Sequence, residues 1–353
     1  MRFIPSSAMR TVRSVASIAL VAALLAACGS GPAPTGAPTP TATPAQAAAA
    51  TATPAATATP APTPAALFPL TFIDDEGTTV TIPSRPQRIV SLTPATTEIL
   101  FAVGAGARVV ATTDFDDYPP EAVALPDVAS FQGVDVEKIV GLEADLVVAG
   151  GNGFNSPDAI AKLRGLGIPV VVVYAPDVSG VLKDIELVAT AAGEPVAGAT
   201  ITAQMQAEIG ALRDALGAAG RTPPRVFYEL DATKEIYGPA DGSFVAEMIS
   251  LAGGDPITTG SPTVFSIPLE VLLAADPQVI VLGDAAYGTT PEIVAARPGW
   301  GGMTAVTSGA VRPVNDVVVT RPGPRLVEGL RALALAIDPA APLPPAAAPT
   351  AAP

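Results

Sequence analysis

The sequence predicts an α/β protein of two lobes, each built on a mostly parallel sheet, with a long helix joining them and a ligand cleft between them. Short β-branched runs alternate with helical stretches, which is the order of parallel α/β folds. A glutamate followed by an apolar helix and a β-branched run occurs twice, in VEKIVGLEADLVVA and in LEVLLAADPQVIVL. A long stretch without a strand candidate, residues 178–219, separates the two copies.

The repeated pattern extends toward the N-terminus in both copies. PQRIVSL begins at Pro86 and PRVFYEL at Pro224, and each strand start is followed by a helical stretch that ends in glycine. In TEILFAVGAG and in AEMISLAGG the glutamate precedes the first glycine by six residues. This repeat is far longer than the roughly 20–50 residues of solenoids, so it favours two globular lobes. Common α/β patterning without duplication is the alternative interpretation.

The N-terminus has the pattern of an export signal, residues 1–27. Arg2, Arg10 and Arg13 precede an apolar stretch, Val15–Ala27, that is too short to span a bilayer as a mature helix. The stretch ends in LLAACGS, which has the form of a bacterial lipobox, so we expect Cys28 to carry a lipid. Cys28 is the only cysteine and cannot form an intrachain disulfide. An ordinary secretory signal with an incidental cysteine is the alternative.

The remaining chain divides by composition. Gly29–Ala66 contains only Gly, Ser, Pro, Ala, Thr and Gln, which is typical of a disordered, partly extended tether. The Pro/Ala-rich tail, residues 339–353, is expected to be disordered as well. We therefore predict a lipidated cysteine and linker at 28–66, an N-terminal lobe at 67–175, a connecting helical segment at 176–223 and a C-terminal lobe at 224–338.

Charge and histidine content exclude several functions. The net charge is −14, and it becomes −17 when the three signal arginines are removed. A domain this acidic is repelled by phosphates and anionic lipid surfaces, which argues against nucleic-acid binding. The chain contains no histidine, so His-based triads, imidazole metal sites and His ligation of haem are excluded. No metal site and no resident cofactor are predicted.

The predicted elements follow in order. Thr71–Ile82 is expected to be a hairpin, because Asp-Asp-Glu-Gly lies between two alternating runs. Apolar runs of the kind covered on both faces then alternate with helices. The expected strands are 88–92, 109–113, 146–150 and 170–174, and the expected helices are 95–103, 136–142 and 157–166.

The middle of the chain is expected to be helical and the second lobe to restart after it. Ala-Gly-Glu-Pro at 192–195 divides the stretch and leaves one long helix from about Ala197 to Ala218. A strand–helix unit begins again at Arg225. Late in the chain, VVVT before Arg321 is predicted to be a strand.

Several segments together resemble a known family. RIVSLTPATTEILFAVGAG, DFDDYPPEA, FQGVDVEKIVGLEADLVVA and RPGPRLVEGLRAL are similar to class III solute-binding proteins of ABC importers, above all the cobalamin-binding members, with iron-siderophore and haem receptors as near relatives. The resemblance covers nearly all of residues 67–338. It implies a monomer whose lobes pivot little about a rigid connecting helix. It also implies an ABC permease with its ATPase as the partner and a metal-bearing small molecule as the ligand.

The resemblance assigns permease docking to Glu137 and Glu270. One carboxylate on each lobe makes a two-point contact that tests lobe spacing and steers docking by charge. From the residues alone a second interpretation stands beside this one. An acid in the first turn of a helix gains about 0.3–1 kcal/mol from the helix dipole.

The resemblance also places ligand contacts in the cleft. In the family, aromatic rings occupy the positions that match Phe115, Phe131 and Val264, and a polar loop matches Asp316 to Arg321. Phe115 lies just past a strand end, and Phe131 lies in a loop-like segment, although core packing is the common alternative for phenylalanine. Val264 supplies no ring, and valines replace the aromatic residues of the family's loop.

Other residues near these motifs are weaker candidates. Asp117 and Tyr118 adjoin the Pro-Pro turn, either as ligand contacts or as residues that cap and pack that turn. Arg321 is expected to reach an anionic ligand oxygen, whereas Arg325 is expected to pack at the start of the last helix. Arg297 and Trp300 lie in a turn general to the family and are left out of the site.

These observations predict an extracytoplasmic, lipid-anchored binding protein that captures a corrinoid and delivers it to an ABC permease. An iron-siderophore or haem receptor is the alternative, and tyrosine ligation keeps haem open. An enzyme has no histidine base, no G-x-S-x-G motif and no cysteine left for catalysis. A surface interaction module is a further alternative, but it would not explain why each lobe carries a glutamate at the equivalent position.

Overall fold

The computed structural model describes residues 67–346. The predicted signal peptide, the lipid site Cys28, the linker up to residue 66 and the last residues of the tail, 347–353, lie outside these described residues. Both predicted lobes fall within one compact unit, residues 63–353. In the described part of the chain, no helix is long and apolar enough to cross a membrane.

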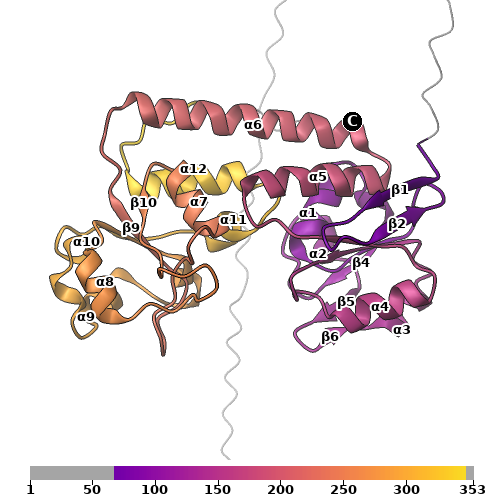
Figure 1. Ribbon diagram of the computed structural model, residues 1–353, viewed down its shortest axis with the longest axis horizontal. Coiled ribbons are helices and arrows are strands. Elements are labelled where there is room, and N and C mark those ends of the chain that lie inside the picture. The colour runs from indigo at the N-terminus through magenta and orange to yellow at the C-terminus, as the bar shows by residue number, and fades with distance from the viewer. Residues whose placement is uncertain (1–66, 347–353) are drawn as a thin grey trace, which may run out of the picture. The chain divides into compact units, whose positions relative to one another are not determined.

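The N-terminal lobe is built on a six-stranded sheet that is parallel except at one edge (Figure 1). A hairpin of β1 (Leu70–Ile73) and β2 (Thr79–Ile82) precedes it, as predicted. The sheet order is β6 (Gly133–Val134), β5 (Asp127–Ser130), β4 (Val109–Thr113), β3 (Ile89–Ser91), β7 (Leu146–Gly150) and β8 (Val170–Val173). The helices of the lobe are α1 (Pro94–Ala102), α2 (Pro120–Val123), α3 (Val136–Gly141) and α4 (Pro157–Gly165).

The C-terminal lobe has a four-stranded sheet in which all pairs are parallel. Its order is β10 (Asp255–Pro256), β9 (Arg225–Glu229), β11 (Val279–Leu282) and β12 (Val311–Pro313). Its helical elements are α7 (Phe244–Leu251), α8 (Leu269–Ala275), the 3-10 turn η2 (Gly283–Tyr287), α9 (Pro291–Ala296), α10 (Thr304–Thr307), α11 (Asp316–Thr320) and α12 (Leu326–Ile337). The predicted α/β class with two mostly parallel sheets is therefore confirmed.

Two consecutive helices connect the lobes, α5 (Val178–Ala192) and α6 (Pro195–Ala218). The chain turns between them at Gly193, whose φ of 83° favours glycine. An added Cβ at Gly198 would lie 2.5 Å from Ala189 Cβ, so the glycine lets the two helices approach closely. α6 packs against α5 and against α12 of the C-terminal lobe (Figure 1).

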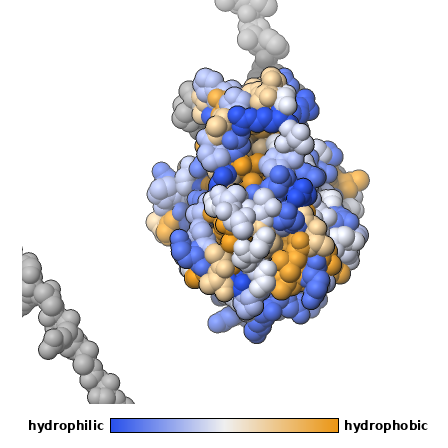
Figure 2. All heavy atoms as spheres, turned by 90° about the vertical axis from the view of Figure 1, so that its left-hand side faces the viewer, coloured by the Kyte–Doolittle hydropathy of each residue, from blue (hydrophilic) through white to orange (hydrophobic). Residues whose placement is uncertain are grey.

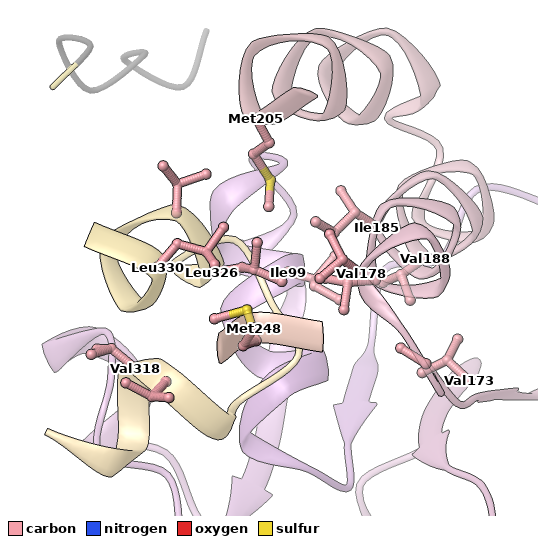
Figure 3. Packing of buried hydrophobic residues seen from close by; sticks show 14 of the residues in the cluster. Ile99, Val173, Val178, Ile185, Val188, Met205, Met248, Val318, Leu326 and Leu330 are labelled. Carbon is pink, nitrogen blue, oxygen red and sulfur yellow. The ribbon is translucent and has the colours of Figure 1, made fainter. Parts of the chain in front are cut away.

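One apolar core joins the helices of both lobes. Met205 of α6 points toward Leu326 and Leu330 of α12, with Ile99 of α1 and Ile185 of α5 beside them (Figure 3). All five side chains are at most 4% exposed. Because a single cluster contains residues from both lobes, relative movement of the lobes would expose apolar surface.

The structure contradicts the prediction of a strand at VVVT, residues 317–320. This segment is the short helix α11, which Asn315 caps by accepting from the N–H of Val317 at 3.2 Å. Val318 and Val319 are buried on one face, against α7 and α12. Tertiary packing thus overrides the strand preference of a β-branched run. An added Cβ at Gly329 of α12 would lie 2.0 Å from Val318 O, which shows how closely α11 and α12 approach.

The tail also differs from the prediction over its described part. Leu343 packs against the main core, and Pro344 O accepts a hydrogen bond of 2.6 Å from Arg331 Nη2. An apolar side chain and one carbonyl acceptor are therefore enough to hold the first part of a Pro/Ala-rich segment against α12.

The two copies of the sequence repeat form equivalent structures. Gly104 after α1 and Gly253 after α7 both have positive φ, 84° and 89°. Arg88 at the start of β3 donates to the last turn of α3 (Nε to Leu142 O, 2.5 Å), and Arg225 at the start of β9 donates to that of α8 (Nε to Ala275 O, 2.8 Å). The arginines at the two strand starts therefore hold the ends of the helices that carry Glu137 and Glu270.

Candidate ligand-binding site

A cavity of about 620 Å³ lies where the carboxyl ends of the two parallel sheets face each other. The N-terminal lobe contributes the residues after β3, β7 and β8, together with Asp184 of α5. The C-terminal lobe contributes Tyr287 of η2 and residues of α11 and the loop after it. Ligand sites of open α/β sheets gather at such ends, and this volume is typical of small-molecule pockets.

Three aromatic rings line the cavity, and the sequence-based predictions missed all of them. Phe154 follows β7, Tyr174 follows β8 and Tyr287 follows β11. Their exposed fractions are 63%, 45% and 90%, so each ring is free to contact a ligand. Phe115 was selected because it follows the carboxyl end of a predicted parallel strand, where ligand sites gather. The same criterion would have found these three rings, because each of them also follows a parallel strand.

Phe115 and Phe131 form a separate aromatic pair that does not line the cavity. Their rings meet edge to face with centroids 4.3 Å apart, and Phe131 is 95% exposed. They follow β4 and β5, on the side of the sheet away from β7 and β8. Val264 is also exposed and outside the cavity lining.

Arg321 lines the cavity, but its guanidinium is already paired. Nη1 donates to Glu98 Oε1 at 2.7 Å and to Asp117 Oδ1 at 2.6 Å. Arg325 donates to the same glutamate, from Nε at 2.9 Å and from Nη2 at 2.5 Å. Its guanidinium also lies 4.3 Å from the centroid of the Tyr118 ring.

These contacts define an interlobe ion cluster of Glu98, Asp117, Arg321 and Arg325. The acids come from the N-terminal lobe and the arginines from the C-terminal lobe, so the cluster ties one lobe to the other. The Glu98 side chain is 2% exposed, and bonding to it raises the pKa of Arg325. Asp117 and Tyr118 thus contact arginines of the other lobe, and neither lines the cavity.

Asp316 lines the cavity from the C-terminal lobe. Tyr228 Oη donates to its Oδ1 at 2.7 Å, and Thr320 Oγ1 lies 3.2 Å from its Oδ2. Burial raises the pKa of Asp316, and burial first, then the Asp316 charge, raises that of Tyr228. The fully buried phenol therefore fixes this carboxyl at the edge of the cavity.

Arg297 and Trp300 are held by contacts inside the C-terminal lobe. Arg297 forms two parallel hydrogen bonds with buried Glu229, at 2.6 and 2.8 Å, and lies 4.7 Å from the Trp300 ring centroid. Trp300 is 3% exposed. Both residues lie outside the cavity lining.

Asp184 lines the cavity from α5 and is 5% exposed. Burial, followed by hydrogen bonding to Asp75, raises the pKa of Asp184 to about 9. Asp75 belongs to the tip of the β1–β2 hairpin, and its Oδ2 accepts a hydrogen bond of 2.8 Å from the N–H of Tyr174. No feature of the sequence pattern pointed to Asp184, because it lies within a long helical stretch.

Glu137 and Glu270 lie in the first turns of α3 and α8. Both are exposed, and neither forms a hydrogen bond or an ion pair within residues 67–346. Figure 2 views the C-terminal lobe end-on and shows mainly hydrophilic residues with smaller hydrophobic patches between them. Two unpaired carboxylates on separate lobes remain available to a cationic partner.

The described residues include no group of three or more His, Cys, Asp and Glu side chains that could hold a metal ion. The cavity lining supports binding through rings, carboxyl groups and loop backbone. It offers aromatic faces for a flat apolar body and hydrogen-bonding groups for a polar edge.

Comparisons with known proteins agree with this geometry. The family model described as "Periplasmic binding protein" matches residues 89–316. The chain is similar to the uncharacterised ABC transporter substrate-binding lipoprotein YvrC of Bacillus subtilis, with 32% identity over 77% of this chain and 87% of the relative. It is also similar to the vitamin B12-binding protein of Pectobacterium carotovorum, with 31% identity over 69% and 85%.

A solved structure gives the same fold. The chain is similar to the periplasmic haem-binding protein RhuT of Roseiflexus sp. RS-1 in its apo form, with a TM-score of 0.64. The identity is 29%, and the match covers 72% of this chain and 99% of that one.

Proposed function

Because the chain belongs to the periplasmic binding protein family and is a substrate-binding protein of ABC transporters, we propose that its ligand is a corrinoid of the cobalamin type. Proteins of this family are extracytoplasmic carriers and not enzymes. The chain would capture the corrinoid outside the cell membrane and deliver it to a permease with its ATPase.

One observation carries the proposal, the ring-lined cavity between the two sheets. Phe154 and Tyr174 come from one lobe and Tyr287 from the other, so a flat macrocycle could lie against rings on both sides. The relatives named for vitamin B12 or cobalamin binding, from Pectobacterium and Halobacterium, support the same ligand class.

Haem is the second candidate, and Tyr174 and Tyr287 favour it. Both phenols line the cavity, and a tyrosine can serve as an axial haem ligand. The chain has no histidine, so tyrosine is the haem ligand that this cavity offers.

Lipid anchoring and permease docking complete the proposal. The lipobox at Cys28 supports an anchor on the outer face of the cell membrane, and the similar protein YvrC is named a lipoprotein. Exposed and unpaired, Glu137 and Glu270 would contact basic groups of the permease.

Calorimetric titration of the full chain with cyanocobalamin and with haemin tests the ligand. Tyr287→Ala should lower the affinity for the ligand about tenfold, because an aromatic contact contributes roughly 0.5–1.5 kcal/mol beyond the effect of its buried area. The ring is 90% exposed, so its loss should not affect folding. Phe131→Ala, equally exposed but outside the cavity, is the matched comparison.

The outcomes separate the possibilities. Binding of cyanocobalamin alone supports the corrinoid, whereas binding of haemin alone supports the haem alternative. Loss of affinity in Phe131→Ala but not in Tyr287→Ala would move the ligand to the Phe115–Phe131 pair. Failure of both ligands to bind would contradict the proposal for this cavity.

Charge reversal tests the docking residues. The double variant Glu137→Lys/Glu270→Lys should abolish ligand uptake by the reconstituted transporter while calorimetry shows normal ligand affinity. Glu121→Lys/Glu292→Lys is the control, because these acids also lie exposed in first helical turns, one on each lobe. Equal loss of uptake in the control would favour the helix-dipole interpretation.

A further inference from the structure

Carboxyl groups face the cavity from opposite walls, and neither has a cation to itself. Asp184 comes from α5 and Asp316 from α11, and neither forms a salt bridge among residues 67–346. Arg321, the cationic side chain of the lining, is bonded to Glu98 and Asp117. The polar character of these two walls is therefore set by carboxyl groups.

Asp184 lies almost fully buried in the cavity wall, with a second acid as its neighbour. Its carboxyl hydrogen-bonds to Asp75, and Asp75 also accepts from the N–H of Tyr174. The hairpin tip is fixed there by Asp75 N–H, which donates to Val172 O at 3.1 Å. Two carboxyl groups in contact cannot both ionise at low cost, so this contact favours one shared proton.

Other charged groups on the surrounding elements do not neutralise this pair. Lys183, the next residue on α5, acts on Asp184 more weakly than burial and Asp75 do. On the helices packed against α5, Glu98 of α1 is bonded to Arg321 and Arg325, and Glu247 of α7 accepts from the N–H of Val178. On α6, Glu208 accepts from Gln204 and Asp214 is exposed.

We infer that Asp184 is a specificity-determining residue whose proton is held toward Asp75, so that its free oxygen accepts a hydrogen bond from a carboxamide N–H on the ligand's edge. Asp316 is an acceptor on the opposite wall, because Tyr228 already donates to it. A ligand carboxylate has only acceptors and would leave these oxygens unpaired. The inference rests on the proposed function, and it selects macrocycles with an amide rim over those with carboxylates.

A matched pair of ligands tests the selection. Cyanocobalamin is compared with each of its separated monocarboxylates, in which one peripheral carboxamide has been hydrolysed. For the full chain at pH 7, at least one monocarboxylate should bind about tenfold more weakly than cyanocobalamin. In Asp184→Leu, which removes the acceptor, this ratio should fall toward one. Asp184→Asn should keep the ratio, because its amide N–H can donate to Asp75 and leave a carbonyl oxygen toward the ligand, as the protonated carboxyl does. Asp214→Asn, an exposed change on α6, should leave the ratio as it is.

Equal binding of all monocarboxylates by the natural protein would overturn the inference, as would an unchanged ratio in Asp184→Leu. If cyanocobalamin does not bind but haemin does, the corrinoid proposal fails, and haemin and its bis-amide become the test pair. Carboxyl ¹³C NMR of the ligand-free chain is independent of either ligand. It should show one carboxyl that is still protonated at pH 7 and that is absent from Asp184→Asn. Its absence from the natural protein would also overturn the inference.

Discussion

Removal of the charge on Glu98 should destabilise the protein strongly, because the interlobe ion cluster depends on this carboxylate. Glu98→Gln keeps the size and shape of the side chain. The amide oxygen of the glutamine can still accept a hydrogen bond from one guanidinium. The amide NH₂ would face the other guanidinium, and because both groups are donors no hydrogen bond can form there. Asp117 would remain bonded to Arg321, whereas Arg325 would keep only the longer-range charges of Glu328 and Asp117.

The expected loss in the free energy of unfolding follows from how deeply the ion cluster is buried. Breaking a buried ion pair by removing one partner costs about 3–5 kcal/mol. The Glu98 side chain is 2% exposed, but those of Arg321 and Arg325 are 15% and 20% exposed, so water can partly solvate them. Arg321 also keeps its bond to Asp117. We therefore expect the lower end of the range, a loss of about 3 kcal/mol in the free energy of unfolding.

Urea denaturation of the full chain measures this loss. Trp300, the only tryptophan, is buried in the C-terminal lobe and reports on that lobe, while far-UV circular dichroism reports on both. Coincident transitions would license a two-state free energy. Asp214→Asn, a change to an exposed acid on α6, should alter it by less than about 0.5 kcal/mol. A loss in Glu98→Gln no larger than in this control would refute the reasoning.

Three further predictions concern stability. Since the pKa of Asp184 is raised from 3.8 to about 9, its stabilisation is full below the unfolded pKa and is lost as pH rises to about 9. Between pH 3.8 and about 9, the free energy of unfolding of Asp184→Asn should therefore fall less steeply with pH than that of the natural protein. Equal slopes in the two proteins would contradict the raised pKa of Asp184. Tyr228→Phe removes the donor to Asp316 and should cost about 1–3 kcal/mol in thermal unfolding, whereas an unchanged midpoint would mean that water replaces the phenol. Gly329→Ala, whose Cβ would lie 2.0 Å from a carbonyl oxygen of α11, should cost more than about 2 kcal/mol, while Gly217→Ala in open space should be neutral or stabilising.

The architecture and the functional class are predictable from the amino-acid sequence alone. Runs such as VVVVY and the alternation of strands with helices are local signals, so they predict the two sheets, the hairpin and the connecting helices directly. The twofold pattern around Glu137 and Glu270 predicted equivalent helices, and both form. The absence of histidine excludes imidazole chemistry whatever the arrangement of the elements.

Which side chains meet depends on the tertiary structure. Arg321 and Glu98 are separated by 223 positions, and no local pattern indicates that they pair. Asp184 lies inside a helix, and its place in the cavity depends on how α5 crosses the strand ends. Phe131 matched the expected family position, yet it lies outside the cavity that Tyr174 and Tyr287 line.

The VVVT segment shows the physical reason most directly. Its β-branched side chains favour a strand, but the segment forms a helix because it is buried against α7 and α12. Gly329 of α12 has no Cβ, so the backbone of the segment can approach α12 closely. Periodicity and composition act over neighbouring residues and therefore determine elements. The cavity lining and the interlobe ion cluster depend on long-range packing, so they follow only from the folded arrangement of those elements.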